Sequence, residues 1–326
     1  MKRVAILGTG SYAPEKILTN ADLEKMVDTT DEWITQRTGI KERHISDKDT
    51  PTSALAAAAA ERALAAAKVK AEDIDFVICG TVTPDMTFPS MACLVQARLG
   101  AAKAVAFDIA AGCTGFVYGM ELARSLITAE PSRKVLLIGA EELTKITDWT
   151  DRSSCVLFGD GAGAVVLAQV DEDRGMLSTF MGADGNLGDL IFQPGGGSLH
   201  PASHETVDGK MHVIKMAGNK VFPHAVRKMG DAATKVLEAA GLPQDKLDLL
   251  IPHQANFRII DAIGRQLNLP MEKVYVNIDK YGNTSAASIP IALDEAVRSG
   301  RIKPGHHVML VAFGAGLTWG AVLMRW

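Results

Sequence analysis

The sequence predicts an α/β fold built from two related halves, and three observations support this prediction. The chain has 326 residues, of which 47% are hydrophobic and 22% charged, enough for two units with a large core. Short apolar runs alternate with helical segments along the whole chain, which is typical of layered α/β proteins. The segment 64–80 is also repeated without a gap, 173 residues later, as 237–253.

The first half contains apolar runs that predict strands over residues 4–8, 76–80, 105–109, 134–138 and 164–168. Helices are expected over residues 21–27, 53–68 and 115–128. Asn20 is expected to cap the first helix, while Thr50 and Pro51 are expected at the cap and first position of the second. The second helix is rich in alanine, a strong helix former whose small side chain permits close packing.

The second half repeats this alternation. Strands are expected near Leu177, Leu249, Val274 and Val308, and helices over 221–240, 257–267 and 286–299. The charged segment 171–174 predicts the seam between an N-terminal half, residues 1–170, and a C-terminal half, residues 171–326. The glycine-rich segment 182–203 predicts a long loop inserted in the second half.

Composition narrows the class of protein. The net charge of −4 gives no global basic field, so we expect no nucleic-acid partner and no membrane partner. No apolar run is long enough to span a bilayer. The four cysteines show no metal-site spacing, and with no secretory signal they predict reduced thiols. We therefore expect a cytoplasmic protein without a metal or a bound cofactor.

One short motif imitates a nucleotide-binding site. Residues 8–13 match the G-x-G-x-x-G/A dinucleotide fingerprint and follow a predicted strand. Pro14 and the residues after it do not open the helix whose N-terminus would hold a pyrophosphate. A dinucleotide site is therefore not expected.

Cys113 is the candidate nucleophile. It follows a strand and a glycine and precedes a helix, where free N–H groups and the helix dipole favour a thiolate of lowered pKa. A free cysteine is more often a small buried apolar residue, and Cys79, Cys93 and Cys155 are interpreted in that way. Cys113 differs because its counterpart in the second half is the polar Asn283.

His253 and Asn283 are the candidate partners of Cys113. His253 ends the apolar run 249–252, and ligands commonly bind at the carboxyl ends of parallel strands; alone it could equally be structural. Asn283 lies in a tight turn before a helix and, alone, could be only a helix cap. A neutral donor beside a histidine suits a developing oxyanion such as an enolate, and the glycine-rich segment 314–316 could supply a further N–H. Because Cys113 lies in one copy of the repeat and His253 and Asn283 lie in the other, the sequence predicts an active site between the two halves.

Five motifs together resemble the β-ketoacyl-(acyl carrier protein) synthase III family of thiolase-like condensing enzymes. They lie at residues 31–40, 111–116, 158–163, 252–256 and 282–286, and the resemblance runs through essentially the whole chain. It implies a thiolase-like fold in which two duplicated βαβαβ-type halves form an α-β-α-β-α sandwich. It also implies a catalytic triad of Cys113, His253 and Asn283.

The reaction of the family supplies roles for these residues. An acyl-CoA substrate would acylate Cys113, and malonyl-acyl carrier protein would then enter and lose CO₂. His253 and Asn283 would hold the thioester oxygen of the resulting enolate, which attacks the acyl group. Backbone N–H groups of Cys113 and Ala315 are expected to form the oxyanion hole. The products would be 3-oxoacyl-acyl carrier protein, CO₂ and CoA, in the first condensation of type II fatty acid synthesis.

The resemblance also implies binding surfaces for the two substrates. Contacts to CoA are expected from Trp33, Arg37, Arg152 and Asn256. Trp33 and Arg37 lie four residues apart and would share one face of a helix. Docking of the acidic carrier protein is expected at Gln254, Arg258 and Arg265. Pro223 stands where some family members carry a docking lysine, and Arg227 and Lys228 are the candidate replacements.

The acyl pocket is expected to be walled by Phe88, Leu143 and Phe158, with Phe88 reaching across the interface of a homodimer. Their bulk is compatible with a short primer such as acetyl-CoA. Apolar pockets discriminate weakly against one methylene, so straight, branched and longer primers stay open.

Three other functions are compatible with parts of this pattern. A ketosynthase or acyltransferase of secondary metabolism would keep the fold and triad but use another primer or acceptor. A hydrolase could also use cysteine and histidine, but Asn283 beside His253 suits an enolate better than an attacking water. A carrier-binding paralogue without activity would be expected to have lost one of the three residues, and all three are present.

Overall fold

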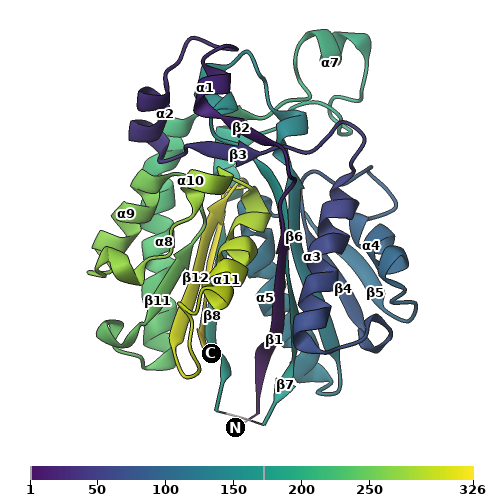
Figure 1. The fold of residues 1–326 in the computed structure, drawn as a ribbon, viewed down its shortest axis with the longest axis vertical. Helices are drawn as coiled ribbons and strands as arrows, with labels where there is room; N and C mark the ends of the chain where they lie inside the picture. The colour runs from purple at the N-terminus through teal and green to yellow at the C-terminus, as the bar shows by residue number, and fades with distance from the viewer. Residues whose placement is uncertain (1, 172) are drawn as a thin grey trace.

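A computed structural model describes residues 2–171 and 173–326 and shows a sandwich of five layers (Figure 1). The first main sheet contains, in spatial order, β1 (Arg3–Tyr12), β7 (Asp160–Val170), β6 (Lys134–Glu142), β4 (Phe76–Gly80) and β5 (Val105–Ile109). The second contains β11 (Leu249–Pro252), β12 (His307–Gly314), β13 (Thr318–Arg325) and β8 (Gly175–Ala183). Helices lie between the two sheets and on both outer faces, which confirms the expected α-β-α-β-α fold.

The second sheet repeats the strand order of the first. β8, β13, β12 and β11 take the places of β1, β7, β6 and β4, with the same parallel and antiparallel pairings. The fifth place is different, and the strand expected near Val274 is wrong. Val274 makes only an isolated parallel bridge with Leu250, because few residues separate η6 (Met271–Lys273) from α10 (Ile278–Tyr281).

The repeated sequence segments have the same local structure. Helix α3 (Thr52–Ala67) ends at Lys68 and helix α8 (Gly218–Ala240) ends at Gly241, both in the left-handed conformation, with φ of 55° and 62°. The single turns η1 (Ala71–Asp73) and η5 (Gln244–Lys246) follow at the same spacing, and then β4 and β11 begin. The 173-residue repeat in the sequence is therefore a repeat in the fold.

The central layer joins the two halves. It contains α5 (Gly115–Ala129) and α11 (Ser288–Arg298), which lie between the sheets in Figure 1. Phe116 and Met120 of α5 belong to one buried cluster with Ile289 and Leu293 of α11 and with apolar residues of both sheets. The outer face of the first sheet is covered by α3 and α4 (Met91–Leu99), and that of the second by α8 and α9 (Phe257–Gln266).

The dinucleotide-like motif is a helix-packing site. Gly8 and Gly10 lie inside β1, against the alanine-rich α3. A Cβ atom at Gly8 would lie 2.3 Å from the backbone nitrogen of Ala67, and one at Gly10 would lie 2.4 Å from that of Ala63. Only glycine permits this approach of strand and helix.

Several predicted boundaries are corrected near the N-terminus. Helix α1 (Asn20–Leu23) is shorter than expected and is capped by Thr19, whose hydroxyl accepts the N–H of Asp22. Asn20 is instead buried, and its amide donates to Asp31 Oδ1 and to the carbonyl of Ile40, each at 2.8 Å. Pro51 is the cap of α3 rather than its first residue.

The long segment after β8 is partly ordered into short elements. It contains η4 (Gly185–Leu190), β9 (Ile191–Phe192) and α7 (His204–Asp208), and β9 pairs with β10 (Lys215–Met216). Above the sandwich in Figure 1 lie β2 (Ile17–Thr19), β3 (Glu42–His44), α1 and α2 (Asp31–Thr38). The predicted seam includes residue 172, which lies outside the described residues, and the division at residue 170 stays a prediction.

Candidate active site

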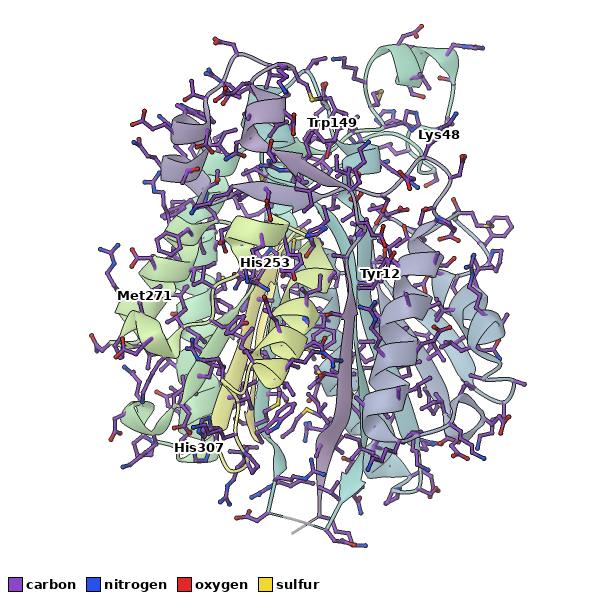
Figure 2. The ribbon with its side chains drawn as sticks, in the orientation of Figure 1. Tyr12, Lys48, Trp149, His253, Met271 and His307 are labelled. Atoms are coloured by element: carbon purple, nitrogen blue, oxygen red, sulfur yellow. The ribbon has the colours of Figure 1, made fainter. Side chains whose placement is uncertain are left out.

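A cavity of about 600 Å³ brings together the three predicted catalytic residues. Cys113 lies in the single turn η2 (Gly112–Thr114) that leads into α5, and His253 directly follows β11. Asn283 lies between α10 and the single turn η7 (Ser285–Ala287). Figure 2 shows His253 in the interior, beside the upper end of α11, whereas His307 lies at the opposite end of the second sheet. The cavity thus receives side chains from both halves.

His253 is a buried, neutral imidazole. It is only 3% exposed, and burial lowers the pKa of His253 to about 3. Its Nδ1 atom lies 2.6 Å from Oγ of Ser288, which also accepts the N–H of Gln254 at 3.4 Å. This leaves the Ser288 proton for Nδ1, an arrangement that favours the tautomer with its proton on Nε2. The ring therefore offers an N–H donor to the cavity.

Asn283 is fixed as a second neutral donor. Its side-chain oxygen accepts the N–H of Ser285 at 2.8 Å, so its NH₂ group is left to donate. Its backbone N–H donates to Leu157 at 2.8 Å, and its carbonyl accepts from Gly159 at 3.1 Å. Two neutral donors in one cavity can stabilise negative charge on an enolate oxygen.

The backbone of Cys113 packs closely against the turn between β12 and β13. A Cβ atom at Gly314 would lie 2.6 Å from the backbone nitrogen of Cys113. A Cβ atom at Gly112, where φ is +53°, would lie 2.9 Å from the nitrogen of Ala315. The two segments expected to form the oxyanion hole are therefore neighbours, and glycine at both positions permits this.

The expectation of a lowered thiol pKa is wrong for the substrate-free protein. Burial raises the pKa of Cys113 to about 11, and the negative charge of Glu141 acts in the same direction. A hydrogen bond from Ser285 opposes this rise. The dipole of α5 does not dominate, since that helix begins two residues later, at Gly115, and a 3₁₀ turn holds Cys113. The thiol is therefore protonated at neutral pH.

The four predicted CoA contacts gather around one tryptophan ring. The guanidinium carbon of Arg37 lies 4.9 Å from the centre of the Trp33 ring, on the same face of α2. The guanidinium of Arg152, in α6 (Arg152–Cys155), lies at the same distance from that ring. Asn256 caps α9 and donates to the carbonyl of Arg37 at 3.0 Å. Trp33, Arg37 and Asn256 line the same cavity as Cys113.

The structure contradicts one predicted docking residue. Gln254 is only 1% exposed, and its amide donates to the carbonyls of Pro252 and Tyr275 at 2.7 and 3.2 Å. Its side-chain oxygen accepts the N–H of Asn277 at 3.0 Å. Gln254 therefore fixes the backbone after His253 and does not face a partner protein.

The basic residues expected to meet the carrier protein lie on α8 and α9. Arg258 lines the cavity, with its guanidinium 5.7 Å from the ring centre of Phe222, and Arg265 is exposed beside Asp261. Of the two candidate replacements near Pro223, Arg227 is exposed. Lys228 is held 4.1 Å from the ring centre of Trp319 and is only partly exposed.

The predicted acyl-pocket residues do not line the cavity of the single chain. Leu143 and Phe158 are buried, and Phe158 forms a bridge with Asn283. Phe88 is 82% exposed. Their role in primer selection stays a prediction.

Sequence reasoning missed two groups of residues. Apolar walls of the cavity come from β9, β10, α8 and their surroundings, namely Ile191, Met216, Val221, Phe222 and Met229. The polar residues Glu141, Ser285 and Ser288 surround the predicted triad. Two features of the sequence could have indicated these polar residues: two adjacent acids at the end of an apolar strand, and two serines shortly after Asn283.

Across residues 2–171 and 173–326, no group of three or more His, Cys, Asp or Glu side chains is arranged to hold a metal ion. In the same residues, no helix combines the length and apolar character needed to cross a bilayer. Cys93 is exposed, contrary to the expectation that it is buried.

Comparisons with known proteins identify the family of the chain. The family model described as 3-oxoacyl-[acyl-carrier-protein] synthase III matches residues 107–185, and its C-terminal counterpart matches residues 237–326. The chain is 58% identical to the β-ketoacyl-[acyl-carrier-protein] synthase III of Caldanaerobacter subterraneus over 98% of this chain and 97% of the relative. It is 56% identical to the enzyme of the same name from Desulfitobacterium hafniense, over 100% of this chain and 98% of the relative.

A solved structure shows the same fold. The 3-oxoacyl-[acyl-carrier-protein] synthase III of Aquifex aeolicus superposes with a TM-score of 0.92 at 50% identity, covering 99% of this chain and all of that one. Sequence, fold and the cavity joining Cys113 to His253 and Asn283 therefore lead to one assignment. The chain belongs to the β-ketoacyl-[acyl-carrier-protein] synthase III family of acyl-transferring condensing enzymes.

Proposed function

We propose that this protein catalyses the initiating condensation between an acyl-CoA and malonyl-acyl carrier protein, with the roles assigned below. One observation carries the proposal. A single cavity is lined by a cysteine, two neutral hydrogen-bond donors, Trp33 and Arg37, and the guanidinium of Arg152 lies near the same tryptophan ring. This combination suits a thiol nucleophile, an enolate and a nucleotide-bearing acyl donor.

The first step is acylation of Cys113. Trp33 offers a flat surface for an adenine ring, and Arg37 and Arg152 carry positive charge for the phosphates of CoA. Asn256 lines the same cavity and donates to the carbonyl of Arg37, and it would be a polar contact for the pantetheine arm. The sulfur of Cys113 attacks the thioester carbon and gives up its proton, the bond to the CoA sulfur breaks, and CoA leaves as the thiol with one proton gained. Backbone N–H groups of Cys113 and Ala315 hold the oxyanion.

The second step is decarboxylation and carbon–carbon bond formation. The malonyl thioester oxygen accepts hydrogen bonds from Nε2 of His253 and from the amide of Asn283. As CO₂ leaves, the electron pair of the broken bond forms an enolate whose charge these donors stabilise. The enolate carbon then attacks the acyl carbon on Cys113, the bond between that carbon and the Cys113 sulfur breaks, and the departing thiolate takes a proton from water. Neutral His253 suits this role because its Nε2–H can donate to the thioester oxygen while its Nδ1 accepts the proton of Ser288.

The carrier protein is proposed to dock at the basic residues around the cavity, in the cytoplasm and without a bound cofactor. Arg258 and Arg265 on α9 and Arg227 on α8 would meet its acidic surface. Gln254 is excluded because it is buried.

We also propose that two copies of the chain associate through the segment around Phe88. Met86 and Phe88 are 48% and 82% exposed, an unusual degree for large apolar residues. Next to them lies an open cavity of about 770 Å³ lined by residues 48–52 and 81–87. A second copy would cover these side chains and could bring Phe88 toward the acyl site of its neighbour.

The test is intact-protein mass spectrometry after incubation with acetyl-, isobutyryl- and hexanoyl-CoA. The wild type should gain one acyl group and Cys113→Ala should gain none. The donor that labels fastest identifies the preferred primer. Absence of an adduct with all three donors would reject the proposed acylation step.

A further inference from the structure

Two threonine hydroxyls meet at the junction of the two halves, and the steps above give them no role. Thr114 ends the turn η2 and is fully buried, whereas Thr318 begins β13 and is half-buried. The two residues are 204 positions apart in the chain, and their Oγ1 atoms are 2.7 Å from each other. Two hydroxyl oxygens at this distance share a proton, because their lone pairs would otherwise repel. The contact is therefore a hydrogen bond between the two halves of the molecule.

Both hydroxyls also reach the turns that are expected to form the oxyanion hole. Oγ1 of Thr114 lies 2.6 Å from the carbonyl oxygen of Ala111, the residue that begins the turn holding Cys113. Oγ1 of Thr318 lies 2.9 Å from the carbonyl oxygen of Ala315 and 3.1 Å from that of Ala111. Among the described residues, every hydrogen bond of these two side chains leads to the other threonine or to one of these carbonyls. One hydroxyl proton joins the two threonines, so the other is left to hold a carbonyl.

The two turns approach each other through glycine. A Cβ atom at Gly112 would lie 2.9 Å from the backbone nitrogen of Ala315. One at Gly314 would lie 2.6 Å from the backbone nitrogen of Cys113. Glycine permits this approach but, as the most flexible residue, does not fix it. In an oxyanion hole both donors must lie about 2.7–3.1 Å from the oxyanion, and misplacement by about 1 Å can cost about 10² in rate. Side chains outside the glycines must therefore hold the two turns at one distance.

We infer that Thr114 and Thr318 form a hydroxyl clasp that sets the spacing of the two backbone N–H donors in the oxyanion hole, an inference that rests on the proposed function. Ala111 lies two residues before Cys113 in the same turn, and Ala315 itself carries the second N–H. A pair of bonded hydroxyls in contact with both carbonyls ties the two donors to a single distance. Negative charge develops on the thioester oxygen during acylation, and again when the enolate attacks the acyl group. The threonines act on both steps through the backbone and are positioning residues.

The test measures acylation by acetyl-CoA in Thr114→Val and Thr318→Val, because valine keeps the branched shape of threonine and removes the hydroxyl. Each variant should lose about tenfold or more of the maximal acylation rate, while the acetyl-CoA concentration for half of that rate should stay within about twofold. Release of CO₂ from malonyl-acyl carrier protein, which depends on His253 and Asn283, should also stay within about twofold. Thr318→Ser keeps a hydroxyl and should recover most of the rate. The double variant should be no slower than the slower single variant, since either substitution opens the same clasp.

Thr9→Val is the matched control. Thr9 is also buried, and its hydroxyl joins the two halves by donating to Asp294 of α11 at 2.7 Å, but neither residue lines the cavity that holds Cys113. Its acylation rate should stay within about twofold of the wild type. Unchanged acylation in both clasp variants, an equal loss of decarboxylation or in Thr9→Val, no recovery in Thr318→Ser, or losses that multiply in the double variant would overturn the clasp. If Thr114→Val does not fold, Thr318→Val decides alone. Failure of the wild type itself to acylate would reject the proposed function, and the clasp with it.

Discussion

The hydroxyl of Ser288 lies 2.6 Å from Nδ1 of His253, at the first position of α11. The serine also accepts the N–H of Gln254, so its own proton points toward the imidazole. His253 is therefore presented to the cavity as an Nε2–H donor by a residue of the central helix layer. Ser288 acts through His253 and is a positioning residue.

Replacing Ser288 should separate the two half-reactions. Ser288→Ala removes the bond that selects the Nε2–H tautomer, so malonyl decarboxylation should fall at least tenfold, on the order of 1.4 kcal/mol. Acylation of Cys113 should stay within about twofold, and Ser288→Thr should restore decarboxylation because it keeps the hydroxyl. Release of CO₂ and acyl-enzyme mass report the two steps. An equal loss in both would show that Ser288 has only a structural role.

His253 should make the protein less stable in acid. Its folded pKa of about 3 lies below the ordinary value of 6.5, so below pH 6.5 the unfolded chain binds a proton that the folded chain refuses. The contribution of His253 to the free energy of unfolding is fully present above pH 6.5 and is lost as the pH falls toward 3. Between pH 7.5 and 5.5 the loss should be about 1.4 kcal/mol. Urea unfolding of wild type and His253→Gln at both pH values measures it, and an equal pH dependence in the two proteins would contradict the assignment.

Trp33 should contribute to binding of the acyl donor. Trp33→Ala removes the ring that faces both Arg37 and Arg152, so the KM for acetyl-CoA should rise about tenfold. The decarboxylation of malonyl-acyl carrier protein should change little. Trp33→Phe keeps an aromatic surface, so its KM for acetyl-CoA should lie between those of the wild type and Trp33→Ala. A KM unchanged in Trp33→Ala would place the nucleotide elsewhere.

Gly314 should be intolerant of any side chain. A Cβ atom there would meet the backbone nitrogen of Cys113 at 2.6 Å and displace the oxyanion-binding backbone. Gly314→Ala should reduce acylation by about 10² or more, the cost of losing an oxyanion-hole donor. Gly197→Ala is the matched control, because a Cβ at Gly197 meets nothing within 4 Å. Similar acylation rates in both variants would contradict the proposed site.

The exposed Phe88 predicts association of two chains. Phe88→Asp should shift the protein toward the monomer in sedimentation velocity, because a charge would be buried without a partner. Leu199→Asp is the matched control, since Leu199 is equally exposed, at 83%. A monomeric wild type, or a dimer unaffected by Phe88→Asp, would reject this interface.

The sequence predicted the layers and the triad because both leave local traces. The repeat around Leu64 and Leu237 recurs as the same helix end and strand, and Cys113, His253 and Asn283 follow strands or open helices in recognisable contexts. The strand at Val274 could not be excluded, because a lone bridge and a strand share the same apolar pattern. The local sequence also predicted a lowered pKa for Cys113. That prediction was wrong because desolvation, which raises the pKa, comes from residues distant in the chain.

The positions of Gln254, Ser285 and Glu141 in the fold depend on tertiary contacts. Gln254 directly follows His253 in a polar stretch, which favoured a surface position, but its amide bonds the backbone of Tyr275 and Asn277 in the interior. Glu141 and Ser285 are 144 residues apart and meet only because η7 packs on β6. No periodicity or motif in the sequence predicts that these two residues become neighbours.

The buried cluster between the sheets has a consequence for the history of this chain. Phe116 and Ile289 share that cluster, so each repeat covers the apolar face of the other, as two subunits of a symmetric dimer would. A dimer of identical copies must carry the same residue at both equivalent positions. Fusion of the copies into one polypeptide removes that constraint. The turns η2 and η7 precede α5 and α11 in the same way, so the structural counterpart of Cys113 is Ala286, and the expected pairing of Cys113 with Asn283 is wrong. A single gene that encodes both copies therefore allows each half to carry a side chain that the other half lacks at the same place in the fold.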